Sequence, residues 1–265
     1  MGYRIFMRCL SQVLRNWLAA LKLSWVWCLV AFAMLLVLVA GRLGIGFSWN
    51  DTALATKILL AVIAIVLLVV GFAFVAIGWH RYVLREEAIG GFFVVRSGWP
   101  ARTYILRWLR IIFIIFLFAI PIAVGAELVS GIFERMFGYS EYGRIALWMA
   151  PVWAFVAQTV SNWAILRIGL GLPAIAVDGD ISVSESFRIT QVYAGQLVVT
   201  AMLIALLGFV PDLLMAATDF APPDMAWPSV IVVTIVGLAF YWIGGFAAIG
   251  ILTVLYGHLV EKRPI

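Results

Sequence analysis

The chain has 265 residues, of which 65% are hydrophobic and 12% are charged, and its mean hydropathy is +1.12. A soluble domain is about 45–50% apolar and about 25% charged. Composition therefore excludes a water-soluble globular protein, a disordered chain, a coiled coil and a disulfide-stapled secreted fold. What remains is an all-α integral membrane protein that crosses the bilayer several times.

Charged residues divide the sequence into apolar stretches, and a membrane helix needs about 20 such residues to cross about 30 Å of hydrocarbon. The third stretch is the shortest. It can cross if Arg107 and Arg110 reach back to the headgroups while Glu127 lies at the opposite surface. We expect residues 1–265 to form a single transmembrane domain. Six spans are predicted, at about 20–41, 57–80, 107–127, 145–167, 192–214 and 228–257.

Lysine and arginine are distributed unevenly between the two sides of these spans. The N-terminus, the second and fourth connections and the C-terminal tail carry 14 of the 18 Lys and Arg residues, and the other connections carry 4. Because cytoplasmic loops are enriched in these residues, both termini are predicted to be cytoplasmic. The net charge of +5 is attributed to this bias and not to nucleic acid, since no nucleic-acid-binding motif is present.

An amphipathic segment over residues 3–18 precedes the first span. Apolar pairs such as Ile5-Phe6 and Val13-Leu14 recur every four residues, with arginines at positions between them. On a helix these pairs form one stripe and the arginines lie on the opposite face. We therefore predict an interfacial helix on the cytoplasmic leaflet, with its basic face toward anionic headgroups. The alternative is a simple extension of the first span.

The third and fifth spans have comparable lead-in segments. Before the fifth span, Ser182 and Glu185 have the spacing of a capping box, in which the two side chains satisfy the first free N–H groups of a helix. The first, third and fifth spans begin roughly ninety residues apart. This spacing predicts three helical hairpins in parallel repetition, with amphipathic interfacial helices on the cytoplasmic side.

A distinctive motif follows the fourth span. Residues 172–180 read LPAIAVDGD, and Ser182–Thr190 follows as S-x-x-E-S-F-R-x-T. Together with the cluster His80–Glu87, this pattern resembles bacterial multi-pass proteins grouped with the membrane domain of glycerophosphoryl diester phosphodiesterases. The resemblance implies a six-span architecture and a location in the bacterial inner membrane. It implies no activity, because the catalytic domain of that family is a separate soluble barrel.

The spans carry no ionisable residue near their middle, where transporters and pumps usually have one. Glu127 and Asp212 at the predicted outer ends could bind a cation, but solvation at the interface accounts for them. His80 and His258 have no metal-ligand spacing, and Asp178–Asp180 is typical of a solvated turn. No catalytic, cofactor-binding or metal-binding residue is therefore predicted.

The predicted function is that of a non-enzymatic inner-membrane protein that organises lipid or a membrane protein complex. The alternative is a small-solute or lipid transporter. The predicted partners are membrane lipids with anionic headgroups at the cytoplasmic face, together with a membrane protein or a second copy of the chain. Gly244 and Ala248 in the sixth span allow close helix approach, either within the chain or in a homodimer. The predicted lipid contacts are Arg4, Arg8, Arg15, Arg81, Arg85 and Arg96.

Overall fold

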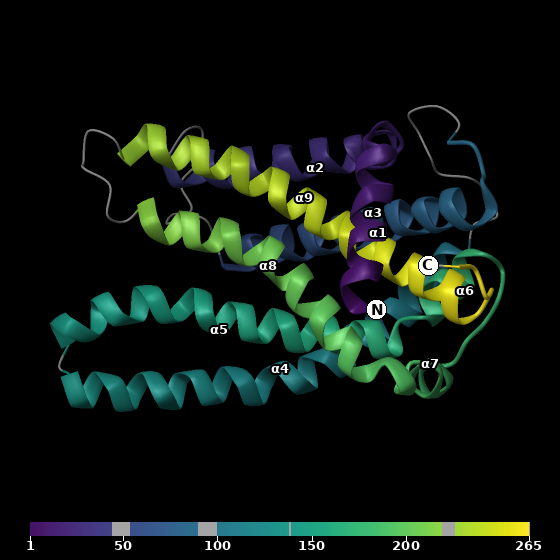
Figure 1. The fold of residues 1–265 in the computed structure, drawn as a ribbon. Coiled ribbons are helices and arrows are strands. Elements are labelled where there is room, and N and C mark those ends of the chain that lie inside the picture. The colour runs from purple at the N-terminus through teal and green to yellow at the C-terminus, as the bar shows by residue number, and fades with distance from the viewer. Residues whose placement is uncertain (44–53, 90–99, 138, 219–225, 265) are drawn as a thin grey trace. The chain divides into compact units, whose positions relative to one another are not determined.

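The computed structural model describes residues 1–43, 54–89, 100–137, 139–218 and 226–264, and every regular secondary-structure element among these residues is a helix (Figure 1). The elements are α1 (Gly2–Arg15), α2 (Trp17–Leu43), α3 (Leu54–Arg85), α4 (Ala101–Phe137), α5 (Tyr139–Ile168), α6 (Gly171–Ala176), α7 (Val183–Ile189), the 3-10 turn η1 (Gln191–Tyr193), α8 (Ala194–Thr218) and α9 (Ala226–Leu259). The chain divides into two compact units. The first comprises Met1–Arg15, Arg107–Ala174 and Asp180–Ile265, and the second comprises Asn16–Leu106 and Ile175–Gly179.

Several helices are long and apolar enough to cross a membrane, as the composition predicts. Within the described residues, four helical stretches are long and apolar enough to cross a bilayer: Ala55–Arg85, Ala101–Phe133, Gln191–Leu214 and Val232–Leu259. A fifth is obtained if α1 and the first part of α2 are taken as one broken span. The all-α class is thereby confirmed, and these helices are consistent with a membrane protein. The count of six spans and their arrangement as three hairpins stay predictions.

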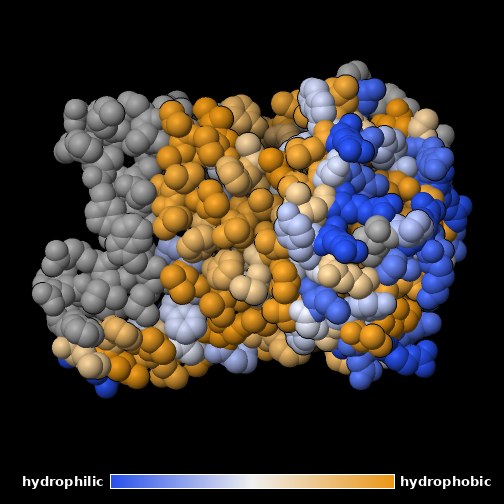
Figure 2. Space-filling model, in the orientation of Figure 1, coloured by the Kyte–Doolittle hydropathy of each residue, from blue (hydrophilic) through white to orange (hydrophobic). Residues whose placement is uncertain are grey.

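Hydrocarbon offers the backbone no hydrogen-bonding partner, so a crossing segment must satisfy its N–H and C=O groups internally, as an α-helix does. The same environment accepts apolar side chains on the outside. Ile65 on α3 is 60% exposed and Phe113 on α4 is 66% exposed. In the first unit, Figure 2 shows hydrophobic side chains over the middle of α4 and α5 and hydrophilic side chains around α7. The helices therefore have surfaces suited to lipid.

The core of the first unit is formed where α8 packs between α5 and α9. Leu197 and Ala201 on α8 are fully buried, as are Ile251 and Leu255 on α9. Residues four apart lie on the same side of a helix, so each pair marks the face that its helix turns inward. Phe155 of α5 and Phe209 of α8 add an edge-to-face ring contact, with centroids 5.5 Å apart.

The amphipathic segment predicted over residues 3–18 is helix α1, which ends at Arg15. Its apolar stripe packs on α8 and α9 of the first unit. The Cys9 thiol lies 3.3 Å from the Ala247 carbonyl oxygen, and the Thr200 hydroxyl donates to the Gly2 carbonyl at 3.2 Å. Helix α1 thus buries its stripe in its own protein, which periodicity alone did not indicate. The buried side chains of the stripe are Ile5, Phe6, Cys9 and Val13.

The second unit is built on α2 and α3. The rings of Trp27 and Phe74 are stacked, with an interplanar angle of 1° and centroids 6.5 Å apart. Gly71 lets the two helices approach closely, because a methyl group there would overlap the Trp27 ring. Near the end of α3, His80 is fully buried, and its Nε2 lies 3.2 Å from the Tyr104 hydroxyl.

Gly2→Ala is expected to weaken the seating of α1, because a methyl group there would overlap the Gln196 carbonyl oxygen. Overpacking of this kind costs about 1–3 kcal/mol. In a Cys28→Ser background, buried Cys9 is the one remaining thiol, and we expect maleimide to label it faster in the Gly2→Ala protein. The control is Gly195→Ala, where a methyl group meets nothing within 4 Å. Equal labelling rates in the two proteins would contradict this packing.

Candidate functional site

Three of the arginines predicted to contact lipid lie on α1. Arg4, Arg8 and Arg15 are four and seven residues apart, so they share one face of the helix, and all three are exposed. Within the part of the chain that the structure describes, none of them has an ion-pair or hydrogen-bond partner. Their charge is therefore available to a ligand outside the protein.

Arg81 and Arg85, also predicted as lipid contacts, have partners within the second unit. Arg81 Nη2 lies 2.7 Å from Glu87 Oε1, and Arg81 Nη1 donates to the Ala176 carbonyl at 2.8 Å. Asp178 Oδ2 lies 3.3 Å from both guanidinium groups. The Arg81 side chain is 14% exposed and that of Arg85 is 43% exposed. Arg85 is therefore the more accessible of the two.

These ion pairs hold the turn that follows α6. Asp178 has a φ of 64°, a left-handed conformation that Asp adopts more readily than most residues. Arg81 and Arg85 donate to the carbonyl oxygens of Ala176 and Val177, which lack intrahelical donors at the end of a helix. Asp178, predicted to lie in a solvated turn, is half exposed, and its carboxylate is in addition ion-paired with Arg81 and Arg85.

The other predicted residues are placed as follows. Arg96 lies outside the described residues. Gly244 faces α8 of the same chain, since a methyl group there would lie 3.7 Å from Leu207 Cβ, an ordinary van der Waals distance. Ala248, four residues later, is half-buried. Gly244 thus packs within the chain, and the homodimer alternative stays a prediction.

The S-x-x-E-S-F-R-x-T motif folds around the C-terminal end of α5. Ser182 caps α7, its Oγ accepting the Glu185 N–H at 3.1 Å as the capping-box spacing predicts. Ser186 is fully buried. Its hydroxyl donates to the Arg167 carbonyl at 3.0 Å and accepts the Leu170 N–H at 3.1 Å. The two serines therefore satisfy backbone groups at helix ends.

Two further motif residues hold the Arg167 side chain. Arg167 is 3% exposed, and its Nη1 donates to the Thr190 carbonyl at 2.8 Å. Its guanidinium carbon lies 4.0 Å from the centre of the Phe187 ring and 5.8 Å from that of Trp163. Both distances are within the range of cation–π attraction. The motif therefore has a structural role at the end of α5.

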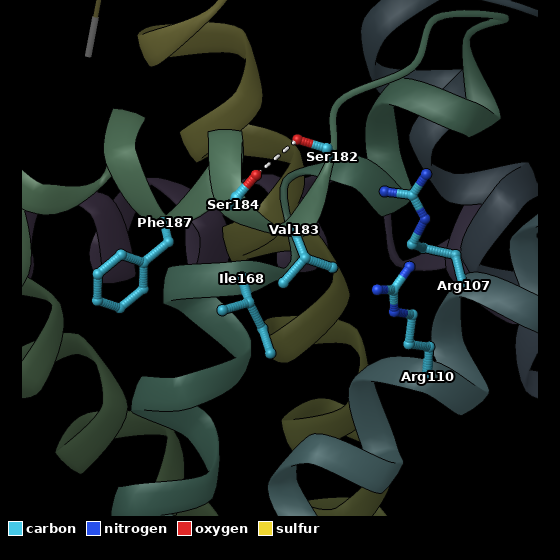
Figure 3. Close-up of a pocket in the computed structure, with 7 residues that line it drawn as sticks. All are labelled: Arg107, Arg110, Ile168, Ser182, Val183, Ser184 and Phe187. Atoms are coloured by element: carbon cyan, nitrogen blue, oxygen red, sulfur yellow. Dashed lines mark hydrogen bonds between the residues drawn. The ribbon is translucent and has the colours of Figure 1, made fainter.

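A pocket of about 450 Å³ lies in the first unit beside the start of α7. Arg107 and Arg110 extend from α4 toward α7, and Val183 and Ile168 lie between the two arginines and Phe187 (Figure 3). The pocket combines cationic, hydroxyl and apolar groups. Its lining residues are Arg107, Arg110, Ile168, Ser182, Val183, Ser184 and Phe187.

The two arginines of the pocket differ in their partners. Arg107 Nη1 donates to the Ile181 carbonyl at 2.6 Å, and Nη2 lies 2.8 Å from Asp180 Oδ1. Arg110 is exposed and has no ion-pair or hydrogen-bond partner among the residues described. Both arginines were predicted to lie at the membrane surface, and the pocket was not predicted. Their spacing of three residues on one helix face was the available signal.

The remaining polar candidates are held in separate contacts. Asp212 Oδ1 accepts the Tyr241 hydroxyl at 2.5 Å, and His80 pairs with Tyr104 in the second unit. His258 Nδ1 lies 2.9 Å from a backbone carbonyl of the C-terminal tail. Where side chains are described, no group of three or more His, Cys, Asp or Glu residues is placed to hold a metal ion.

Comparison with family models, curated proteins and solved structures found no match for this chain. The resemblance to the phosphodiesterase membrane domain therefore stands on the motif alone. In the structure, the residues of that motif make hydrogen bonds and ring contacts at the end of α5. Indications of function come instead from the exposed arginines of α1 and from the pocket beside α7.

Ser186→Ala is expected to lower the free energy of unfolding by about 1–3 kcal/mol, because the buried Leu170 N–H loses its partner and the Arg167 carbonyl loses one donor. Ser184→Ala on the same helix is the control. It removes an exposed hydroxyl contact with Ser182 and is expected to change the free energy by less than about 0.5 kcal/mol. Thermal unfolding of the two detergent-purified proteins checks this, and equal midpoints would contradict the role of Ser186.

Proposed function

We propose that this protein is a non-enzymatic protein of the bacterial inner membrane that gathers anionic lipid at its cytoplasmic face. In this proposal six spans cross the membrane as three hairpins, and both termini are cytoplasmic. The four or five helices that are long and apolar enough to cross a membrane support the multi-pass topology. The distribution of Lys and Arg, 14 against 4, supports the orientation.

The observation that carries the proposal is the division of α1 into three faces. The first is the apolar stripe, which is buried on α8 and α9. The second consists of exposed apolar side chains, with Tyr3 61%, Met7 42% and Leu14 52% exposed. These are four and seven residues apart and therefore lie on one side of the helix. The third face carries the exposed arginines.

Each face suits a different environment. A helix seated on its own protein can direct an apolar flank into the acyl boundary and its cationic side chains toward the headgroups. Each Lys or Arg near an anionic membrane surface contributes about 1 kcal/mol of attraction. No ion pair among the described residues competes for the charge of Arg4, Arg8 or Arg15. By contrast, Arg81 is already paired with Glu87, so we assign the main contribution to α1.

Replacement of Arg4, Arg8 and Arg15 together by Gln tests the proposal. The wild-type chain is reconstituted in mixed phosphatidylcholine and phosphatidylglycerol bilayers and extracted gently, and the retained lipids are quantified by mass spectrometry. We expect the wild type to retain an excess of phosphatidylglycerol at low salt. The triple variant is expected to lose most of this excess, because about 3 kcal/mol of attraction is removed. High salt is expected to have the same effect on the wild type.

The matched control is the variant Arg42→Gln, Arg135→Gln, Arg144→Gln. It removes the same number of positive charges, but from the side of the membrane predicted to be external. We expect it to retain phosphatidylglycerol as the wild type does. An equal excess of phosphatidylglycerol in the wild type and in the α1 variant at low salt would contradict the proposal.

A further inference from the structure

We infer that the pocket beside α7 binds the phosphate group of an anionic phospholipid headgroup. The inference rests on the proposed function and deepens it, because it adds one specific lipid site to the general attraction exerted by α1. The pocket belongs to the first unit and is lined by none of the α1 arginines. Its charge, its hydroxyl groups and its position on α4 each support the assignment.

The pocket carries one uncompensated positive charge. Arg107 is paired with Asp180 and is held by the Ile181 carbonyl, so its guanidinium is fixed in place and its charge is balanced. Arg110 has no partner among the described residues. Two arginines and one aspartate give a net charge of +1. A phosphodiester carries one negative charge and accepts charge-assisted hydrogen bonds from arginine, so it matches this site.

The two serines leave one hydrogen-bond donor for a ligand. Ser182 Oγ already accepts the Glu185 N–H, and it lies 3.2 Å from Ser184 Oγ. One of the two hydroxyl groups therefore donates to the other, which uses one of their two protons. Whichever serine is the donor, the second O–H remains available. A phosphate oxygen can accept this hydroxyl while another oxygen accepts a donor of Arg110.

The position of Arg110 on α4 places the pocket at the level of lipid headgroups. No charged residue lies between Arg110 and Glu127, and this stretch is part of a helix able to cross the membrane. The pocket also has an apolar wall formed by Ile168, Val183 and Phe187. Such a wall suits the glycerol backbone and first acyl carbons of a lipid, which free phosphate lacks. The volume of about 450 Å³ is in the range of small-ligand sites.

Titration of short-chain phosphatidylglycerol into the full-length, detergent-purified protein tests the inference. Arg110→Gln removes the uncompensated charge and is expected to raise the Kd about tenfold or more. Because Arg110 is exposed, this variant is expected to fold. Val183→Trp fills the pocket without changing its charge and is expected to weaken binding comparably. The control, Arg188→Gln, removes an exposed α7 arginine that does not line the pocket, and should change the Kd less than about twofold.

Two further ligands identify the source of the phosphate. Short-chain phosphatidylcholine has the same phosphodiester beside a quaternary amine, and we expect it to bind at least about tenfold more weakly. Inorganic phosphate has no glycerol, and we expect it not to displace phosphatidylglycerol. Equally tight binding of phosphatidylcholine, or Arg110-dependent binding of inorganic phosphate as tight as that of the lipid, would overturn the anionic-lipid assignment. Unchanged Kd values in both pocket variants would overturn the site itself.

The α1 triple variant distinguishes this inference from the proposed function. We expect it to bind short-chain phosphatidylglycerol with the wild-type Kd, because its arginines do not line the pocket. Conversely, Arg110→Gln is expected to keep the general excess of phosphatidylglycerol. One pair of results would support the pocket and contradict the proposed function: Arg110→Gln binds short-chain phosphatidylglycerol more weakly, while the α1 variant retains the wild-type excess of phosphatidylglycerol. The opposite pair of results would support the proposed function and overturn the pocket.

Discussion

The last carbonyl groups of α5 have no donors within their own helix, so donors must come from elsewhere. The Arg167 carbonyl accepts the hydroxyl groups of Ser186 and Thr190, so hydrogen bonds attach α7 to the end of α5. This attachment determines where Ser182 and Phe187 lie, on either side of Ser186 along the chain. Both line the pocket. The position of the pocket wall therefore depends on the hydrogen bonds that the buried end of α5 accepts.

Positive charge serves two purposes in this protein. Some arginines satisfy backbone carbonyls or carboxylates of the protein itself and so stabilise turns and helix ends, as Arg81 does for the end of α6 and Arg107 does for the Ile181 carbonyl. Others have no partner among the residues described, and their charge is directed outward. The total excess of Lys and Arg supports the proposed orientation, whereas the unpaired arginines are the ones that we propose to contact lipid. Arg4, Arg8, Arg15 and Arg110 are among the unpaired ones.

Local patterns in the sequence were sufficient to predict the all-α class, the amphipathic character of α1 and the capping of α7 by Ser182. They could not show what covers the α1 stripe, because periodicity identifies an apolar face but not its neighbour. The contact of Gly2 with Gln196 depends on tertiary packing, as does the pairing of Arg81 with Asp178 across 97 positions. For the same reason, the arginines of the pocket could be identified in the sequence but its wall on α7 could not.

The two proposed modes of lipid binding make different demands on the membrane. The attraction of α1 acts over about a Debye length, does not depend on headgroup shape and weakens with salt. The pocket requires one headgroup in direct contact, and its occupancy rises with the local concentration of anionic lipid that α1 would provide. Helix α4 contains the long apolar stretch Ala101–Phe133. Among the described residues, only 6% of the most apolar part of this stretch is buried. A headgroup that contacts Arg110 on α4 and either Ser182 or Ser184 would therefore add a link between a largely unburied helix and the packed end of α5.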